Sequence, residues 1–100
     1  MLRPSAYPIL DEIVDALKDN PGILLVEVEG HTDQQGNDAY NMDLSIRRAA
    51  TVMRYLVSQG IAESRLTSQG YGETRLVDPR HTQEAYQANR RVAFSIKRRE

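Results

Sequence analysis

The stretch from Leu24 to Glu29 constrains the fold of this chain more than any other part of the sequence. After Leu24, apolar and acidic residues alternate, which is the pattern of a β-strand with one face in the core. The expected apolar face carries Leu24, Val26 and Val28. Glu27 and Glu29 fall on the other face, so we expect that face to be partly exposed to solvent. Other elements must then cover the apolar face of the strand.

A polar turn follows the expected strand and leads into a helix. Gly30 ends the strand, and Asp33 lies in the turn. A helix is expected from Ser45 to Gln59, because apolar residues recur there with helical spacing and a glycine follows. Arg47 and Arg48 would lie in its first turn, close to backbone N–H groups that favour a bound anion. A carboxylate at a strand end would thus lie one loop away from guanidinium groups, which suits a ligand that carries both an ammonium and a carboxylate.

Arg48 is the better placed of the two adjacent arginines. At ~100° per residue, it lies at the edge of the polar arc of the helix, in line with Leu44 and Val52. Arg47 lies on the opposite, polar side of the helix. We therefore expect Arg48 to lean over a protein surface.

The remaining elements are predicted from residues that cap or end helices and from the alternation of apolar and polar residues in strands. Ser5 is expected to cap a first helix that the sequence Asn20-Pro21-Gly22 ends. A short strand and turn are expected over 67–73, and an irregular loop over 74–81. A brief helix capped by Thr82 and a final alternating strand over 91–97 complete the chain. The expected order is helix, strand, helix, strand, strand.

Length and composition indicate one globular domain spanning residues 1–100. Hydrophobic residues make up 40% of the sequence and charged residues 27%, and the net charge of −1 argues against a nucleic-acid-binding protein. The sequence has no cysteine, which excludes disulfides and thiolate zinc sites. We expect no membrane insertion of this domain, because no apolar run approaches the ~20 residues that span a bilayer. The first four residues also show no signal peptide, so the chain is expected to be either cytoplasmic or a domain of a longer exported protein.

The order and spacing of these residues resemble the OmpA-like domain, which occurs in OmpA-type porins, the Pal lipoprotein and the flagellar stator protein MotB. The resemblance covers nearly the whole chain. The matching residues are Gly30-His31-Thr32-Asp33, Gly36, Asn41, Leu44-Ser45, Arg48-Ala49, Val52, Tyr55-Leu56, Gly60-Ile61, Arg65-Leu66, Gly70-Tyr71-Gly72-Glu73 and Asn89-Arg90-Arg91-Val92.

The resemblance implies an α+β fold, a two-layer βαβαββ sandwich with a mixed sheet and helices on one face. The family's first strand precedes the first helix, whereas only residues 1–3 precede Pro4 here, so we expect that strand to be missing. Because the family places it beside the last strand, residues 92–96 would present an unpaired edge. This edge would allow two copies of the chain to associate as a homodimer.

The resemblance also implies a function without catalysis or a cofactor. Family members bind peptidoglycan non-covalently through the diaminopimelate of the stem peptide and anchor the outer membrane or a membrane complex to the cell wall. The implied location is the periplasm, with a membrane tether elsewhere in the full-length protein. The expected ligand-binding residues are Asp33, Arg48, Asn41, Thr32, Leu44 and Arg91. Arg91 is preferred over Arg90 because, on strand alternation, it points away from Val92 and Phe94.

The residues alone leave other interpretations open. Asp33 is also typical of a turn residue, and Arg48 of a solvated helix residue. His31 and Asp33 would suit a metal pair, but His81, the only other histidine, lies far off in a loop, so we expect no metal. A cell-wall hydrolase would need a poised nucleophile or a carboxylate pair, which the sequence does not offer. A ligand-free oligomerisation module is a further alternative, with a surface formed by Tyr7, Tyr55, Tyr71 and Tyr86.

Overall fold

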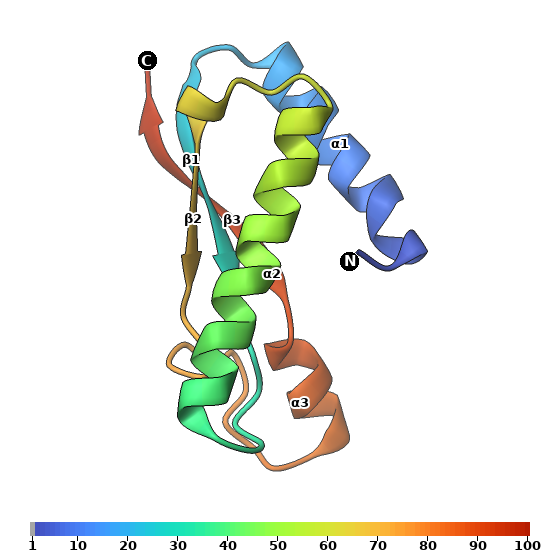
Figure 1. Ribbon diagram of the computed structural model, residues 1–100, viewed down its shortest axis with the longest axis vertical. Helices are drawn as coiled ribbons and strands as arrows, with labels where there is room; N and C mark the ends of the chain where they lie inside the picture. Colours follow the sequence, from blue (N-terminus) through green and yellow to red (C-terminus); the bar gives the residue numbers. More distant parts are fainter. Residues whose placement is uncertain (1) are drawn as a thin grey trace.

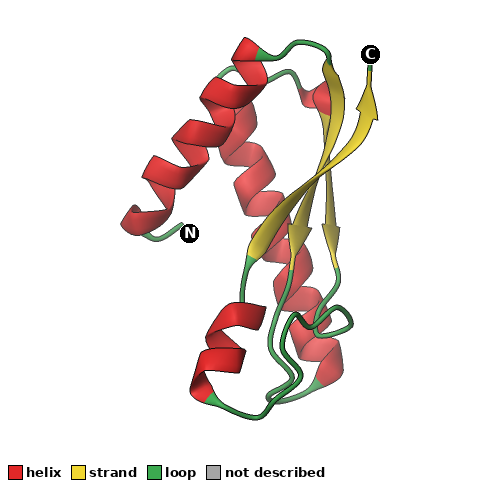
Figure 2. Cartoon of the chain, turned by 180° about the vertical axis from the view of Figure 1, so that it is seen from behind, coloured by secondary structure: helices red, strands yellow, loops and turns green. Residues whose placement is uncertain are grey.

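The chain folds into a three-stranded sheet with two helices against one face, as Figure 1 and Figure 2 show from opposite sides. The structure is a computed structural model that describes residues 2–100, so Met1 lies outside the described residues. The elements in chain order are the 3-10 turn η1 (Pro4–Ala6), α1 (Tyr7–Asp19), β1 (Ile23–Gly30), α2 (Asp38–Ser58), the 3-10 turn η2 (Glu63–Arg65), β2 (Leu66–Gly70), α3 (Gln83–Asn89) and β3 (Val92–Arg99).

The sheet is mixed, in the strand order β2-β1-β3. β1 pairs in parallel with β2, where Val26 lies opposite Leu66. β1 is antiparallel to β3, and Val28 lies opposite Phe94. The α+β fold with a mixed sheet and helices on one face is therefore confirmed. β3 lies at one edge of the sheet, while the expectation of a missing first strand stays a prediction.

The core lies between the helices and the apolar face of β1. Val26 and Val28 are buried there, as the alternation of the strand predicts. The side chains that cover them come mainly from α1 (Leu10, Val14, Leu17) and α2 (Ala49, Val52, Leu56). The apolar stripes at helical spacing are thus the surfaces that join the two layers.

The second helix begins earlier than expected, at Asp38 instead of Ser45. Asn37 caps it, because its side chain accepts a hydrogen bond from the backbone N–H of Tyr40 at 3.0 Å. Arg48 therefore lies ten residues inside the helix, and the expectation that it lies in the first turn is wrong. The N–H groups at the start of α2 do not surround Arg48.

The predicted cap of the first helix is also wrong. Ser5 lies within η1, and α1 starts at Tyr7 without a hydrogen bond from a capping side chain. In contrast, Thr82 caps α3 as predicted, since its hydroxyl accepts from the backbone N–H of Ala85. β2 ends at Gly70 and a turn follows at 72–75, so the short strand and turn expected over 67–73 are both present. The loop that follows is irregular, as expected.

Candidate functional site

The loop after β1 holds Thr32 and Asp33 in a buried turn. The Asp33 carboxylate accepts a hydrogen bond from the backbone N–H of Gln35 at 2.8 Å. Thr32 donates its backbone N–H to the Gly72 carbonyl at 2.8 Å and its hydroxyl to the Asp33 carbonyl at 3.0 Å. Both residues are less than one-tenth exposed. The loop is therefore fixed by its own side chains and by the segment after β2.

Asn41 supports this loop from α2. Its side chain is buried and donates a hydrogen bond to the backbone carbonyl of Gln35 at 2.8 Å. A buried amide with such a partner orders the backbone that it binds. Asn41 is thus placed to position the loop that carries Asp33.

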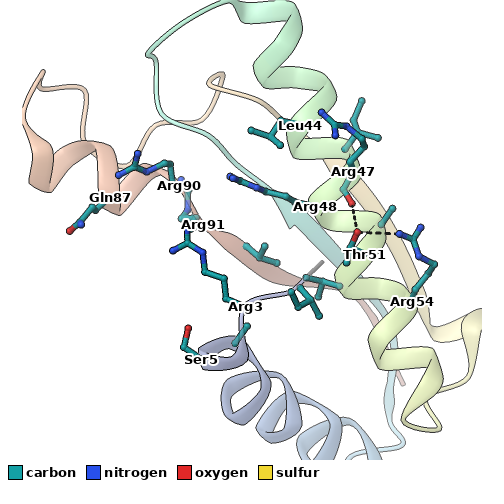
Figure 3. Close-up of a pocket in the computed structure, with 16 residues that line it drawn as sticks. Arg3, Ser5, Leu44, Arg47, Arg48, Thr51, Arg54, Gln87, Arg90 and Arg91 are labelled. Carbon is teal, nitrogen blue, oxygen red and sulfur yellow. Dashed lines mark hydrogen bonds between the residues drawn. The ribbon is translucent and has the colours of Figure 1, made fainter.

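A groove of about 1020 Å³ opens beside α2, between η1 and the segment that joins α3 to β3. Figure 3 shows its lining side chains, with Arg48 pointing from α2 toward Arg90 and Arg91. The positively charged residues that line the groove are Arg3, Arg47, Arg48, Arg54, Arg90 and Arg91. No aspartate or glutamate among the described residues lines it. The groove therefore attracts anions.

The six residues expected from the sequence divide into two sets. Three of them, Leu44, Arg48 and Arg91, line the groove. The other three, Thr32, Asp33 and Asn41, do not line it and belong to the buried loop and its support.

Arg90 connects the two sets. Its Nη1 atom lies 3.4 Å from Oδ2 of Asp33, and its side chain also lines the groove. Arg91, the arginine predicted to bind the ligand, instead donates hydrogen bonds to the backbone carbonyls of Asn89 and Arg75. Strand alternation could not distinguish Arg90 from Arg91, because β3 begins only at Val92 and both arginines precede it. The one sequence signal for Arg90 was its place in the matching Asn89-Arg90-Arg91 segment.

Asn89 is a positioning residue for which the sequence alone predicted no role. It is fully buried, and its Oδ1 accepts hydrogen bonds from the backbone N–H groups of Val77 and Asp78 at 2.8 and 3.1 Å. Its Nδ2 donates to the Asp78 carbonyl at 2.7 Å. These bonds tie the end of α3 to the loop over 74–81 and so fix the backbone that presents Arg90 and Arg91.

The acidic face of β1 is more covered than expected, since Glu29 is buried and only Glu27 stays partly exposed. His31 is 1% exposed, and its Nε2 lies 3.1 Å from a Glu29 carboxylate oxygen. The ring of His31 stacks on Tyr71, whose hydroxyl donates to Glu27 at 2.7 Å. Burial lowers the pKa of His31, although the hydrogen bond to Glu29 opposes this shift. This polar cluster lies directly before the turn of Asp33.

The described part of the chain was also compared with the requirements of a metal site and of a membrane-spanning helix. Within residues 2–100, no three histidine or acidic side chains gather as a metal ion would require. No helix in the same range has the length and apolar character needed to cross a membrane.

Three comparisons with known proteins agree with one another. The sequence profile of the OmpA family matches residues 1–90. The chain is 43% identical to outer membrane porin F of Pseudomonas fluorescens over 96% of its own length and 29% of that protein. It is 42% identical to the peptidoglycan-associated lipoprotein of Pseudomonas aeruginosa over 91% of its own length and 53% of that protein. It therefore spans about half or less of these relatives.

A solved structure has the same fold as this chain. The cell wall anchor of the T6SS from Pseudomonas aeruginosa superposes with a TM-score of 0.84 at 31% identity, over 99% of this chain and 70% of that one. The two proteins therefore share the same overall fold over nearly the whole of this chain.

Proposed function

The chain belongs to the OmpA family, and on this basis we propose that it binds peptidoglycan non-covalently and anchors a larger assembly to the cell wall. Two similar proteins carry names that point the same way, a peptidoglycan-associated lipoprotein and a cell wall anchor. The proposed location is the periplasm, with a membrane tether outside this domain. The proposed unit is a single domain over residues 1–100.

The observation that carries this proposal is that Arg48 lines the same groove as Arg90, which also contacts Asp33. The free end of diaminopimelate carries an ammonium and a carboxylate on one carbon. Arg48 has no carboxylate partner among the described residues, and a guanidinium binds a carboxylate through two parallel hydrogen bonds. In this proposal, Arg48 binds the carboxylate of the ligand.

Asp33 binds the ammonium in the same proposal, and this requires Arg90 to move aside. The contact between Arg90 and Asp33 is loose at 3.4 Å, and the Arg90 side chain is 42% exposed. Because Asp33 is buried, the departing guanidinium must be replaced by another positive charge, and the ligand ammonium supplies that charge. Asp33 keeps its hydrogen bond from Gln35 throughout.

The remaining residues hold or shape this site. Leu44 and Arg91 line the groove beside Arg48. Thr32 and Asn41 hold the loop of Asp33 by hydrogen bonds to its backbone. None of these roles breaks a covalent bond, so the proposed activity is binding without catalysis.

The strength of a single site is expected to be modest. Hydrogen bonds to charged groups contribute about 1.5–3 kcal/mol each, and the entropy lost on association offsets much of this gain. The cell wall repeats its stem peptides many times, so several copies of the domain held in one membrane would be retained together.

Co-sedimentation with insoluble peptidoglycan tests the proposal. We expect Asp33→Ala and Arg48→Ala each to abolish sedimentation, because each removes one half of the recognition of the head group. Arg98→Ala is the matched control for Arg48→Ala, since Arg98 lies on β3 outside the groove and its loss removes the same positive charge. The proposal is wrong if both site variants remain folded by circular dichroism and still sediment like the unchanged chain.

Titration with diaminopimelate separates binding from a ligand-free oligomerisation module. Binding predicts shifts of NMR resonances around Asp33 and Arg48, whereas an oligomerisation module predicts none.

A further inference from the structure

The positive charge of the groove extends well beyond the residues that one amino-acid head group can occupy. Six arginines line it in a chain whose net charge is only −1. Two of the six are paired with carboxylates, Arg47 with Asp43 and Arg90 with Asp33. The other four, Arg3, Arg48, Arg54 and Arg91, form no ion pair with any carboxylate of residues 2–100.

The unpaired guanidinium groups do not all face the same way. Arg54 is six residues after Arg48 on α2, so the two side chains diverge around the helix, and Arg54 donates a hydrogen bond to Thr51 at 3.1 Å. In Figure 3, Arg54 points away from Arg48. The same view shows Arg3 and Arg91 near one another at the end of the groove beside α1. Arg3, Arg48 and Arg91 therefore form a positive wall of the groove without carboxylate partners in residues 2–100.

This wall is built from three separate parts of the chain. Arg3 precedes η1, Arg48 lies within α2, and Arg91 precedes β3. Arg91 is held in place, because its guanidinium donates to the backbone carbonyls of Asn89 and Arg75 at 3.2 and 3.0 Å. Positive charges gathered without counter-charges repel one another, and a bound anion relieves this repulsion.

We propose that Arg3 and Arg91 form a second anion subsite, which takes another carboxylate of the same stem peptide. This inference rests on the proposed function, in which Arg48 binds the carboxylate of the diaminopimelate head group. An extended peptide advances about 3.3–3.6 Å per residue, so a carboxylate one or two residues along the peptide would pass beside the wall. The domain would then prefer stem peptides whose carboxylates are free over peptides in which they are amidated.

Two synthetic peptides test this subsite. Both contain diaminopimelate next to a glutamyl residue, with a free carboxylate on that residue in one peptide and a carboxamide in the other. We expect the unchanged chain to bind the free acid about fivefold more tightly, which corresponds to an exposed ion pair of about 1 kcal/mol. The preference should weaken as salt is added, because the pair is exposed to solvent.

Arg3→Gln is the informative variant. It should bind both peptides with the affinity that the unchanged chain shows for the amidated one. Arg98→Gln removes the same charge outside the groove and should keep the fivefold preference. Equal affinity of the unchanged chain for the two peptides, or a preference that survives in Arg3→Gln, would overturn the inference.

The outcomes also separate this inference from the proposed function. If the unchanged chain binds both peptides equally well, the second subsite is absent and the head-group site stands. If it binds neither peptide, the proposed function fails and the inference fails with it. If Arg3→Gln leaves the affinity for both peptides unchanged but weakens binding to phosphatidylglycerol vesicles, the wall binds a membrane surface, and the inference is wrong.

Discussion

Burial of His31 links the stability of the domain to pH. The side chain is 1% exposed, and its Nδ1 has no hydrogen-bond partner within the described chain when Nε2 bonds Glu29. Burial lowers the pKa of His31 below its ordinary value of 6.5, and the nearby positive charges of Arg91 and Arg75 lower it further. The hydrogen bond to Glu29 and its negative charge act in the opposite direction and raise the pKa of His31. The neutral ring is the form that the fold favours.

We therefore predict that the free energy of unfolding falls as pH is lowered through and below 6.5. In this range the unfolded chain binds the proton more readily than the folded chain, so stability is lost on acidification. Urea denaturation at a series of pH values measures the effect, and His31→Gln should flatten the profile between pH 7 and pH 5. His81→Gln is the control, because it makes the same substitution at the other histidine, which is exposed. An unchanged slope in His31→Gln would contradict the prediction.

At the scale of single residues, the sequence located the loop of Asp33 but not what covers it. Alternation placed Glu27 and Glu29 on a strand face that was expected to be partly exposed to solvent. A periodic pattern cannot show that residues far away in the sequence cover that face. Tyr71 comes from beyond β2, and it contacts both Glu27 and His31. The same limit applied to Arg90, whose contact with Asp33 joins positions far apart in the sequence.

The packing of α2 on the sheet depends on two glycines at strand ends. A methyl group on Gly30 would collide with the backbone carbonyl of Ser45, and one on Gly70 would collide with the backbone of Ile46. In both cases the nearest atom belongs to the backbone of α2, which cannot move aside as a side chain can, and at Gly70 side-chain atoms of Ile46 and Ser45 are also in the way. The absence of a side chain at these positions therefore lets α2 lie directly against the ends of β1 and β2, next to the loop of Asp33.

We predict that Gly30→Ala destabilises the domain by about 3 kcal/mol or more, because overpacking against a backbone forces the helix away from the sheet. Gly22→Ala is the matched control, since a methyl group there would meet only ordinary contacts with Glu100. It should change stability by less than about 1 kcal/mol. Chemical denaturation of the two variants measures both values, and equal stabilities would contradict this account of the packing.

The elements were predicted where apolar periodicity is strong and misplaced where it is weak. β1 and the apolar stripe of α1 follow the expected pattern, because each buries one face in the core. The first turns of α2 gave no such signal, since Asn41 and Ser45 on their buried side are polar and bond to loops. The start of the helix depends on the cap at Asn37, whose neighbouring residues also suit a loop.

For the whole molecule, the mixed sheet leaves β3 at an edge. The backbone N–H of His31 donates to the carbonyl of Arg91 at 2.9 Å, and bonding alternates along an antiparallel pair. The N–H and C=O groups of Val92, Phe94 and Ile96 therefore point away from β1. No residue of β3 is buried.

We predict that the 100-residue chain associates in solution through this edge, because outward backbone groups pair readily with a second strand. Light scattering after gel filtration should show a molecular mass that rises with protein concentration. Ile96→Lys should weaken the association about tenfold, since Ile96 is 43% exposed on the edge and a lysine there opposes strand pairing. Val77→Lys adds the same charge at an exposed site in the loop over 74–81 and should leave the association unchanged. A constant monomer mass at high concentration would contradict the prediction, and equal weakening by both variants would assign the association to general charge instead of the β3 edge.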